Sequence, residues 1–135
     1  MVYKIIDIQG VGEAYAAKLI AAGINTVDDL LEKGKTAKGR KELEETTGIS
    51  GKLILTWVNH ADLFRVKGIG PQFSELLEAA GVDTVKELGM RRADNLCAKM
   101  NEVNEAKHLT KAVPTVAQLQ KMIDQAKALP GVVTY

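Results

Sequence analysis

Few side chains in this sequence are placed where they could ligate a metal or carry out catalysis. The candidates are Asn59, His60 and Asp62, which follow Trp57 closely, and the isolated Cys97 and His108. His108 has no second histidine or cysteine at zinc-ligand spacing, and Cys97 falls among apolar helical positions. Trp57 is expected in the core, whereas His60 and Asp62 fall off its apolar stripe and are expected to be solvated. These patterns predict no metal, no cofactor and no catalytic residue.

Two Gly-apolar-Gly triplets, Gly10–Gly12 and Gly68–Gly70, are the other chemically suggestive feature. A dinucleotide-binding loop needs a third glycine after a buried strand, but Ala14 and Tyr15 occupy that place after the first triplet. Nucleophile motifs, a Walker loop and paired catalytic carboxylates are also missing from the sequence. The sequence therefore predicts a protein that is not an enzyme.

The composition is that of one ordinary globular domain. The 135 residues are 46% hydrophobic and 26% charged, and their apolar runs are far shorter than the roughly 20 residues of a membrane span. The N-terminus does not resemble a secretory signal, and one cysteine allows no internal disulfide, so we expect a cytoplasmic protein with no membrane association. A formal net charge of +1 is low for a dedicated DNA-binding protein, so any basic surface must be local.

An internal repeat organises the chain. Residues 8–30 and 66–88 align without a gap at an offset of 58, and nine of the 23 positions are identical. The identical residues are Gly10/Gly68, Gly12/Gly70, Leu19/Leu77, Ala21/Ala79, Ala22/Ala80, Gly23/Gly81, Thr26/Thr84, Val27/Val85 and Leu30/Leu88. The repeat predicts one structural unit used twice.

Each repeat has the pattern of a turn followed by two helices. The triplet supplies the turn, with its apolar middle residue plugged into the core, and opens a helix with one apolar face. We expect those faces to be Tyr15, Leu19 and Ile20 in one repeat and Phe73, Leu76 and Leu77 in the other. Gly23 and Gly81 stand where a helix C-cap belongs. Thr84 with Glu87 then forms a capping box for a short helix, and Thr26 with Asp29 approximates one.

The rest of the chain is also helical in pattern, so the predicted fold class is all-α. We expect helices over about 36–47, from about Ser50, over about 93–109 and after Pro114 and Thr115, where Gln118 completes another capping box. Only residues 2–8 show a strand-like alternation. We predict a single domain over 1–135, with repeat one at about 5–64 and repeat two at about 65–129, packed with pseudo-two-fold symmetry. Residues 130–135 form an extended C-terminal tail that could pack, pair or remain free.

The doubled pattern resembles the tandem helix-hairpin-helix family. The similarity is carried by residues 8–30 and 66–88, and GRKELEETTGIS, ILTWVNHADLFRVKGIG and residues 104–109 resemble a bacterial set of such proteins classed as a domain of unknown function. The resemblance implies that backbone N–H groups in the turns hold phosphate oxygens of DNA without reading the bases. It places the binding residues at Gly10, Val11, Gly12, Gly68, Ile69 and Gly70, with Arg65 and Lys67 beside them.

The sequence departs from the DNA-binding pattern of that family. Glu13 puts a carboxylate where a phosphate would bind, so the first turn should bind weakly. Ala14, Pro71 and Gln72 stand where a Lys, Arg or Thr is common. Arg65 and Lys67 make the second turn the better candidate.

Basic residues after each repeat could add phosphate contacts. They are Lys35, Lys38, Arg40 and Lys41, preceded by Lys33, and Arg91 and Arg92. Because Glu42, Glu44 and Glu45 follow the first group at once, we interpret that group as a solvated loop and helix end. A contribution from both loops stays open as an alternative.

Two functions remain open at this point. One is a module that binds nucleic acid, DNA above all, through the turns. The other is a protein-interaction or scaffolding module with the same fold, which the near-neutral charge and Glu13 favour. The sequence does not fix the oligomeric state.

Overall fold

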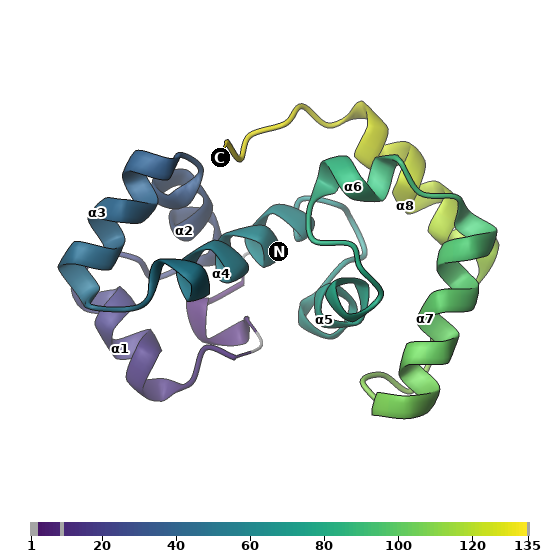
Figure 1. Ribbon diagram of the computed structural model, residues 1–135, viewed down its shortest axis with the longest axis horizontal. Helices are drawn as coiled ribbons and strands as arrows, with labels where there is room; N and C mark the ends of the chain where they lie inside the picture. The colour runs from purple at the N-terminus through teal and green to yellow at the C-terminus, as the bar shows by residue number, and fades with distance from the viewer. Residues whose placement is uncertain (1–2, 9, 135) are drawn as a thin grey trace. The chain divides into compact units, whose positions relative to one another are not determined.

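The computed structural model describes residues 3–8 and 10–134, and its regular elements are helices (Figure 1). The all-α fold class is therefore confirmed. No strand is formed within the described residues, where Lys4 and Thr26 make an isolated antiparallel bridge. In the segment whose pattern resembled a strand, Ile5–Asp7 is the 3-10 helix η1, while Val2 lies outside the described residues.

Eight α-helices follow η1 in the described part of the chain. They are α1 (Glu13–Ala21), α2 (Val27–Gly34), α3 (Ala37–Thr47), α4 (Gly51–Leu63), α5 (Pro71–Ala79), α6 (Val85–Gly89), α7 (Ala93–Lys107) and α8 (Val116–Ala128). Their bounds match the helices expected from the sequence to within a few residues. None of these helices combines the length and the apolar composition that crossing a membrane requires.

The chain divides into two compact units. The first runs through Asp62 and includes the residues from Val132 onward, and the second is Leu63–Gly131. The division falls next to residue 64, where the first sequence repeat was expected to end.

Threonine side chains fix the starts of four helices. Thr26, Thr36, Thr84 and Thr115 each accept a hydrogen bond from the backbone N–H three residues later, at 3.0 to 3.1 Å. The capping boxes of α2 and α8 are complete, as predicted. The box predicted for α6 is formed only in part: Thr84 accepts from the N–H of Glu87, but the Glu87 carboxylate accepts from the N–H of Asp83, the residue before the N-cap, at 3.2 Å. Each cap supplies acceptors for N–H groups that have none in their own helix.

Glycine ends α1 and α5 in the same way. The N–H of Gly23 donates to the carbonyl of Ile20 (2.9 Å), and the N–H of Ile24 reaches back to Leu19 (2.9 Å), which is a Schellman motif. Gly81 makes the equivalent turn after α5, and the two glycines have φ values of +90° and +94°. The C-caps themselves are Ala22 and Ala80, so each predicted glycine stands one residue later and ends the helix with a left-handed backbone that other residues rarely adopt.

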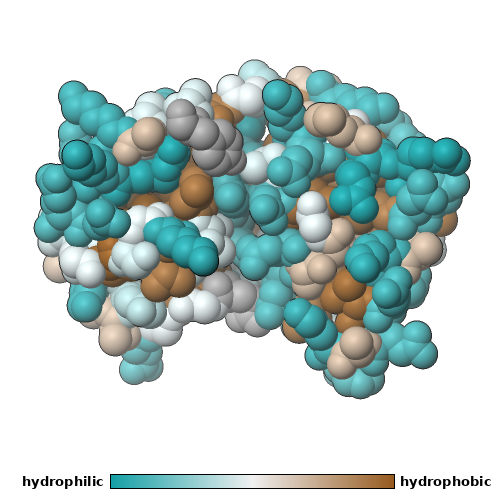
Figure 2. Space-filling model, viewed as in Figure 1, coloured by the Kyte–Doolittle hydropathy of each residue, from teal (hydrophilic) through white to brown (hydrophobic). Residues whose placement is uncertain are grey.

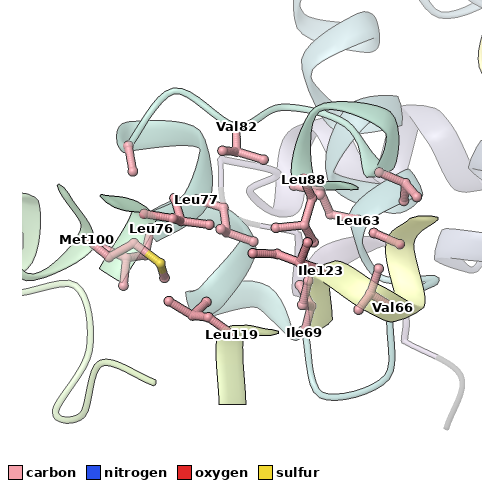
Figure 3. Packing of buried hydrophobic residues seen from close by; sticks show 14 of the residues in the cluster. Leu63, Val66, Ile69, Leu76, Leu77, Val82, Leu88, Met100, Leu119 and Ile123 are labelled. Carbon is pink, nitrogen blue, oxygen red and sulfur yellow. The ribbon is translucent and has the colours of Figure 1, made fainter. Parts of the chain in front are cut away.

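The second unit has a continuous apolar core. Side chains from α5, α6, α7 and α8, and Ile69 from the turn before α5, gather into this cluster (Figure 3). α8 packs against both α6 and α7, and α7 packs against α5. The labelled members in Figure 3 are Leu63, Val66, Ile69, Leu76, Leu77, Val82, Leu88, Met100, Leu119 and Ile123.

Three expectations about burial on α1 and α4 were wrong. Ile20, expected on the buried face of α1, is 50% exposed. His60 and Asp62, expected to be solvated, are each only 3% exposed. His60 and Asp62 belong to α4, on which buried positions are not confined to the apolar stripe that contains Trp57.

Candidate functional site

The two glycine turns have the same backbone hydrogen bonds. In the first turn the N–H of Val11 donates to the carbonyl of Ile8 at 3.1 Å. In the second, the N–H of Ile69 donates to Val66 at 3.1 Å, so each bond in one turn has its counterpart 58 residues away. Because the local geometry repeats as closely as the sequence does, the two turns can be compared position by position.

The first glycine and the apolar residue of each triplet have structural roles. Gly10 and Gly68 take φ values of +91° and +97°, in the region that favours glycine. Val11 and Ile69 are 4% and 3% exposed, so the apolar middle residues plug into the core as predicted. Folding alone accounts for these four residues.

The second glycine is different. Gly12 and Gly70 are the N-caps of α1 and α5, and both have extended backbone, which any residue can adopt. A Cβ atom added at Gly12 would meet nothing within 4 Å. Neither N-cap provides a side-chain hydrogen bond. The first N–H groups of these helices thus face an N-cap without a side chain, in contrast to the threonine caps of α2, α3, α6 and α8.

An aromatic cluster lies beneath the first turn. The indole nitrogen of the buried Trp57 is 3.5 Å from where a Cβ of Gly10 would stand. The Tyr15 ring packs edge-on against Trp57 with centroids 5.2 Å apart, and the Lys18 ammonium lies 6.0 Å from the Tyr15 centroid. Glu13, at the first position of α1, is exposed. The first turn therefore packs against the Trp57 indole, and the exposed Glu13 places a negative charge where α1 begins.

The second turn is partly covered by α8. The N–H of Lys67 donates to the Gln125 side-chain oxygen at 2.7 Å, and a Cβ at Gly68 would lie 3.2 Å from the Met122 methyl group. The Arg65 guanidinium, expected beside a phosphate, donates to the carbonyl of Pro130 at 2.6 Å. Two of the groups expected to serve the second turn are therefore engaged within the second unit.

The chain matches a known protein family over residues 9–129, under the description "Domain of unknown function (DUF4332)". The chain belongs to the DUF4332 family. The expected kinship with proteins classed as a domain of unknown function is thereby confirmed. Comparison with curated proteins and with solved structures found no match. The family description names no activity, so the function of this DUF4332 protein has to be argued from its residues.

Two of the five cations in the basic run of the first unit, Lys33 and Lys35, form ion pairs with carboxylates. Lys33 pairs with Glu42 at 2.7 Å and Lys35 with Glu32 at 3.1 Å. The hydrogen bond from Lys33, followed by its charge, lowers the pKa of the Glu42 carboxyl. Such exposed pairs contribute little to stability, but they reduce the positive potential of the loop. Lys38 and Lys41 are exposed on α3, and phosphate contact by these two lysines stays a prediction.

Arg40 differs from its neighbours and from the expectation of a solvated loop. Its side chain is only 8% exposed, and its Nη1 donates to the carbonyl of Gly34 at 2.8 Å. Its Nη2 donates to the carbonyl of Thr134 at 2.6 Å. Arg40 thus holds together two segments of the first unit, which a pattern of charges along the sequence cannot reveal.

Arg91 and Arg92 follow α6, as expected from the second repeat. Arg92 is exposed and pairs with Asp94 at 3.1 Å. The N–H of Asn95, with a smaller effect from the charge of Arg92, lowers the pKa of Asp94. The Nη1 of Arg91 lies 3.8 Å from where a Cβ of Gly81 would stand, near the end of α5. Arg92 is therefore engaged in a local ion pair, while Arg91 lies near the end of α5.

The surface offers few large apolar side chains. On the face shown in Figure 2, hydrophilic residues predominate and hydrophobic ones show in small separate areas. The large hydrophobic residues that are exposed in the described part of the chain are Ile6, Ile20, Met90 and Val116.

Proposed function

We propose that the two glycine turns are helix-hairpin-helix motifs and that this DUF4332 protein is a non-enzymatic module that binds DNA without base specificity. The phosphate ligands would be the backbone N–H groups around Gly68, Ile69 and Gly70, with a second site around Gly10–Gly12. The observation that carries the proposal is that α1 and α5 start at glycine N-caps that supply no side-chain acceptor. Unpaired N–H groups and the helix dipole together favour an anion at such a helix start.

The charge of the protein fits this mode of binding. Peptide groups hold the phosphate, so few cationic side chains are needed and a net charge of +1 is sufficient. Salt dependence of DNA binding follows the number of phosphates that cations neutralise. We therefore expect a shallow salt slope and weak overall affinity.

The two turns differ in what favours them. The second turn has the exposed Lys67 beside it, but Pro71 has no N–H to offer and Gln125 already accepts from Lys67. The first turn is open above Gly12, but Glu13 repels a phosphate there. Each turn therefore offers fewer N–H groups to a phosphate than an unobstructed turn would. We propose that the second turn contributes more to DNA affinity than the first.

A protein-interaction module is the second candidate. Ile20, on α1, is 50% exposed, and Met90, after α6, is 75% exposed. Exposed apolar side chains of this size are suited to a protein partner, although scattered ones are also normal on a monomer. The two candidates make opposite predictions for DNA titration.

The test adds a competing acceptor at the proposed sites. In Gly70→Asp and Gly12→Asp the new carboxylate would cap the same N–H groups, so stability should hold or rise while DNA binding falls. Loss of a charged hydrogen bond of about 1.5–3 kcal/mol corresponds to a roughly tenfold or greater loss of affinity. Fluorescence anisotropy with a labelled random-sequence duplex measures the DNA affinity of each variant. Titrations at about 50 and 200 mM salt cover the range over which phosphate contacts weaken.

Thr115→Asp is the matched control, because it adds the same charge at a helix start that is already capped. It should leave DNA affinity within about twofold, as expected of a screened surface charge. An absence of wild-type binding at the lower salt, or an equal loss in Thr115→Asp, would overturn the proposal. Far-UV circular dichroism of each variant establishes that the helices are intact.

A further inference from the structure

The buried guanidinium of Arg40, in the first unit, donates a hydrogen bond to a segment far away in the sequence. Arg40 stands in the first turns of α3, and Thr134 is 94 residues further along. The Arg40 side chain donates to the Thr134 carbonyl at 2.6 Å while also donating to Gly34 at 2.8 Å. The planar fork of arginine suits two such acceptors at once.

The other main-chain group of Thr134 is paired as well. Its N–H donates to the carbonyl of Lys35 at 2.7 Å, and its hydroxyl approaches the same oxygen at 3.3 Å. Gly34 and Lys35 are the last residue and the C-cap of α2, where carbonyls have no N–H donor in their own helix. Arg40 and Thr134 together therefore cap the end of α2.

The contacts at this corner recognise a main chain. Thr134 is held through its N–H and its C=O, and the two valines before it are partly buried. A site that supplies one acceptor and one donor to the same residue accepts an extended peptide, as in strand addition at a sheet edge. Any copy of the segment Val132–Thr134 presents the same groups.

The approach to the corner allows exchange of the segment. Pro130 and Gly131 precede it and belong to the second unit, whereas the residues from Val132 belong to the first. Gly131 is exposed, and a Cβ there would meet nothing within 4 Å. Glycine restricts the backbone least of all residues, which favours replacement of the chain's own segment by the identical segment of another copy.

We propose that the corner between α2 and α3, formed by Gly34, Lys35 and Arg40, is a peptide-docking site. The structure shows it occupied by Val132–Thr134 of the same chain, and its second occupant is the same extended segment of another copy. The inference is independent of DNA binding, because it involves neither glycine turn. It gives Arg40 a role in peptide recognition in place of phosphate contact.

The test supplies the segment as a labelled peptide covering residues 128–135 and measures its binding to the full chain by fluorescence anisotropy. The receptor is Thr134→Pro, in which the chain's own segment loses the N–H that donates to Lys35. Thr134→Pro should bind the peptide about tenfold more tightly than wild type does. In wild type the chain's own segment competes with the peptide at an effective concentration on the order of millimolar. Thr134→Ala keeps both main-chain groups and should behave as wild type.

A second peptide keeps the test independent of how Arg40 variants fold. The same peptide with proline in place of threonine lacks the N–H and should not bind Thr134→Pro at concentrations that saturate with the natural sequence. Equal binding of the two peptides, or no binding of the natural one to folded Thr134→Pro, would overturn the proposal. In the Thr134→Pro background, Arg40→Lys should reduce peptide affinity and the exposed neighbour Lys41→Ala should not.

Discussion

The backbone N–H of Lys67 donates to the side-chain oxygen of Gln125, 2.7 Å away. This bond places α8 over the turn that the sequence marks as the better phosphate site. An acceptor from the protein therefore already occupies a donor that a phosphate could use. Whether the turn binds DNA depends on how readily this acceptor is displaced.

Gln125→Ala is expected to increase DNA affinity. The substitution removes the internal acceptor, and a hydrogen bond has a net worth of about 0.5–1.5 kcal/mol, so affinity should rise roughly 2- to 10-fold. Anisotropy titration at about 50 mM salt measures the change. Gln120→Ala is the control, because Gln120 lies on the same helix and its amide pairs with Asp124 at 2.9 Å. Unchanged or weaker binding in Gln125→Ala would show that the second turn is not a phosphate site.

Glu13→Gln is expected to strengthen the contribution of the first turn. The carboxylate at the start of α1 interacts with the helix dipole by about 0.3–1 kcal/mol, and a phosphate competes for the same end of the helix. Affinity for duplex DNA should rise roughly 2- to 5-fold, and stability should fall slightly. Glu45→Gln removes an equally exposed carboxylate from α3 and should leave affinity unchanged. A matching rise in both variants would point to general charge effects.

Gly39→Ala is expected to destabilise the first unit. A Cβ at Gly39 would overlap the carbonyl oxygen of Lys33, a backbone atom that cannot move without shifting α2 against α3. Strain of this kind costs about 1–3 kcal/mol, measurable by urea denaturation. Gly131→Ala is the control, since a Cβ there meets nothing within 4 Å and should be neutral or slightly stabilising. Equal stability of the two variants would contradict the close approach at Gly39.

Local signals in the sequence determined most of the helical architecture. Thr26 and Thr115 cap helix starts as predicted, and Gly23 and Gly81 end helices one residue after the C-caps, because capping depends on neighbours within a few residues. The position of Ile20 could also have been predicted. Its counterpart in the second repeat is Glu78, a residue that does not belong in a core.

Long-range contacts were beyond such signals. In the sequence Arg40 is one cation of a basic run, and none of its sequence neighbours indicates that the Thr134 carbonyl accepts a hydrogen bond from it. Similarly, Gln125 is an ordinary polar position of α8 until the fold brings it to Lys67. Both interactions join main-chain groups to a distant side chain, so neither leaves a pattern of periodicity or charge. The sequence therefore predicted the two glycine turns of the candidate site, but not the bonds that Gln125 and Thr134 make with residues distant in sequence.

Asp29 gives the first unit a predictable response to acid. Its carboxylate accepts from the N–H groups of Asn25 and Thr26, each at 3.1 Å, and these bonds lower its pKa below the ordinary value of 3.8. Because the pKa of Asp29 is lower in the folded state than in the unfolded state, its ionisation stabilises the fold at pH values above the unfolded-state pKa. This stabilisation is lost as the pH falls through the folded-state pKa. Between pH 7 and about pH 3, the melting temperature of wild type should therefore fall more than that of Asp29→Asn. At pH 7 the variant should be the less stable of the two, because a neutral amide accepts more weakly than a carboxylate. Thermal denaturation followed by circular dichroism measures both, and Asp28→Asn, one residue earlier and exposed, provides the comparison. If Asp29→Asn and wild type lost stability in parallel as the pH fell, the Asp29 bonds would not be the source of the acid response.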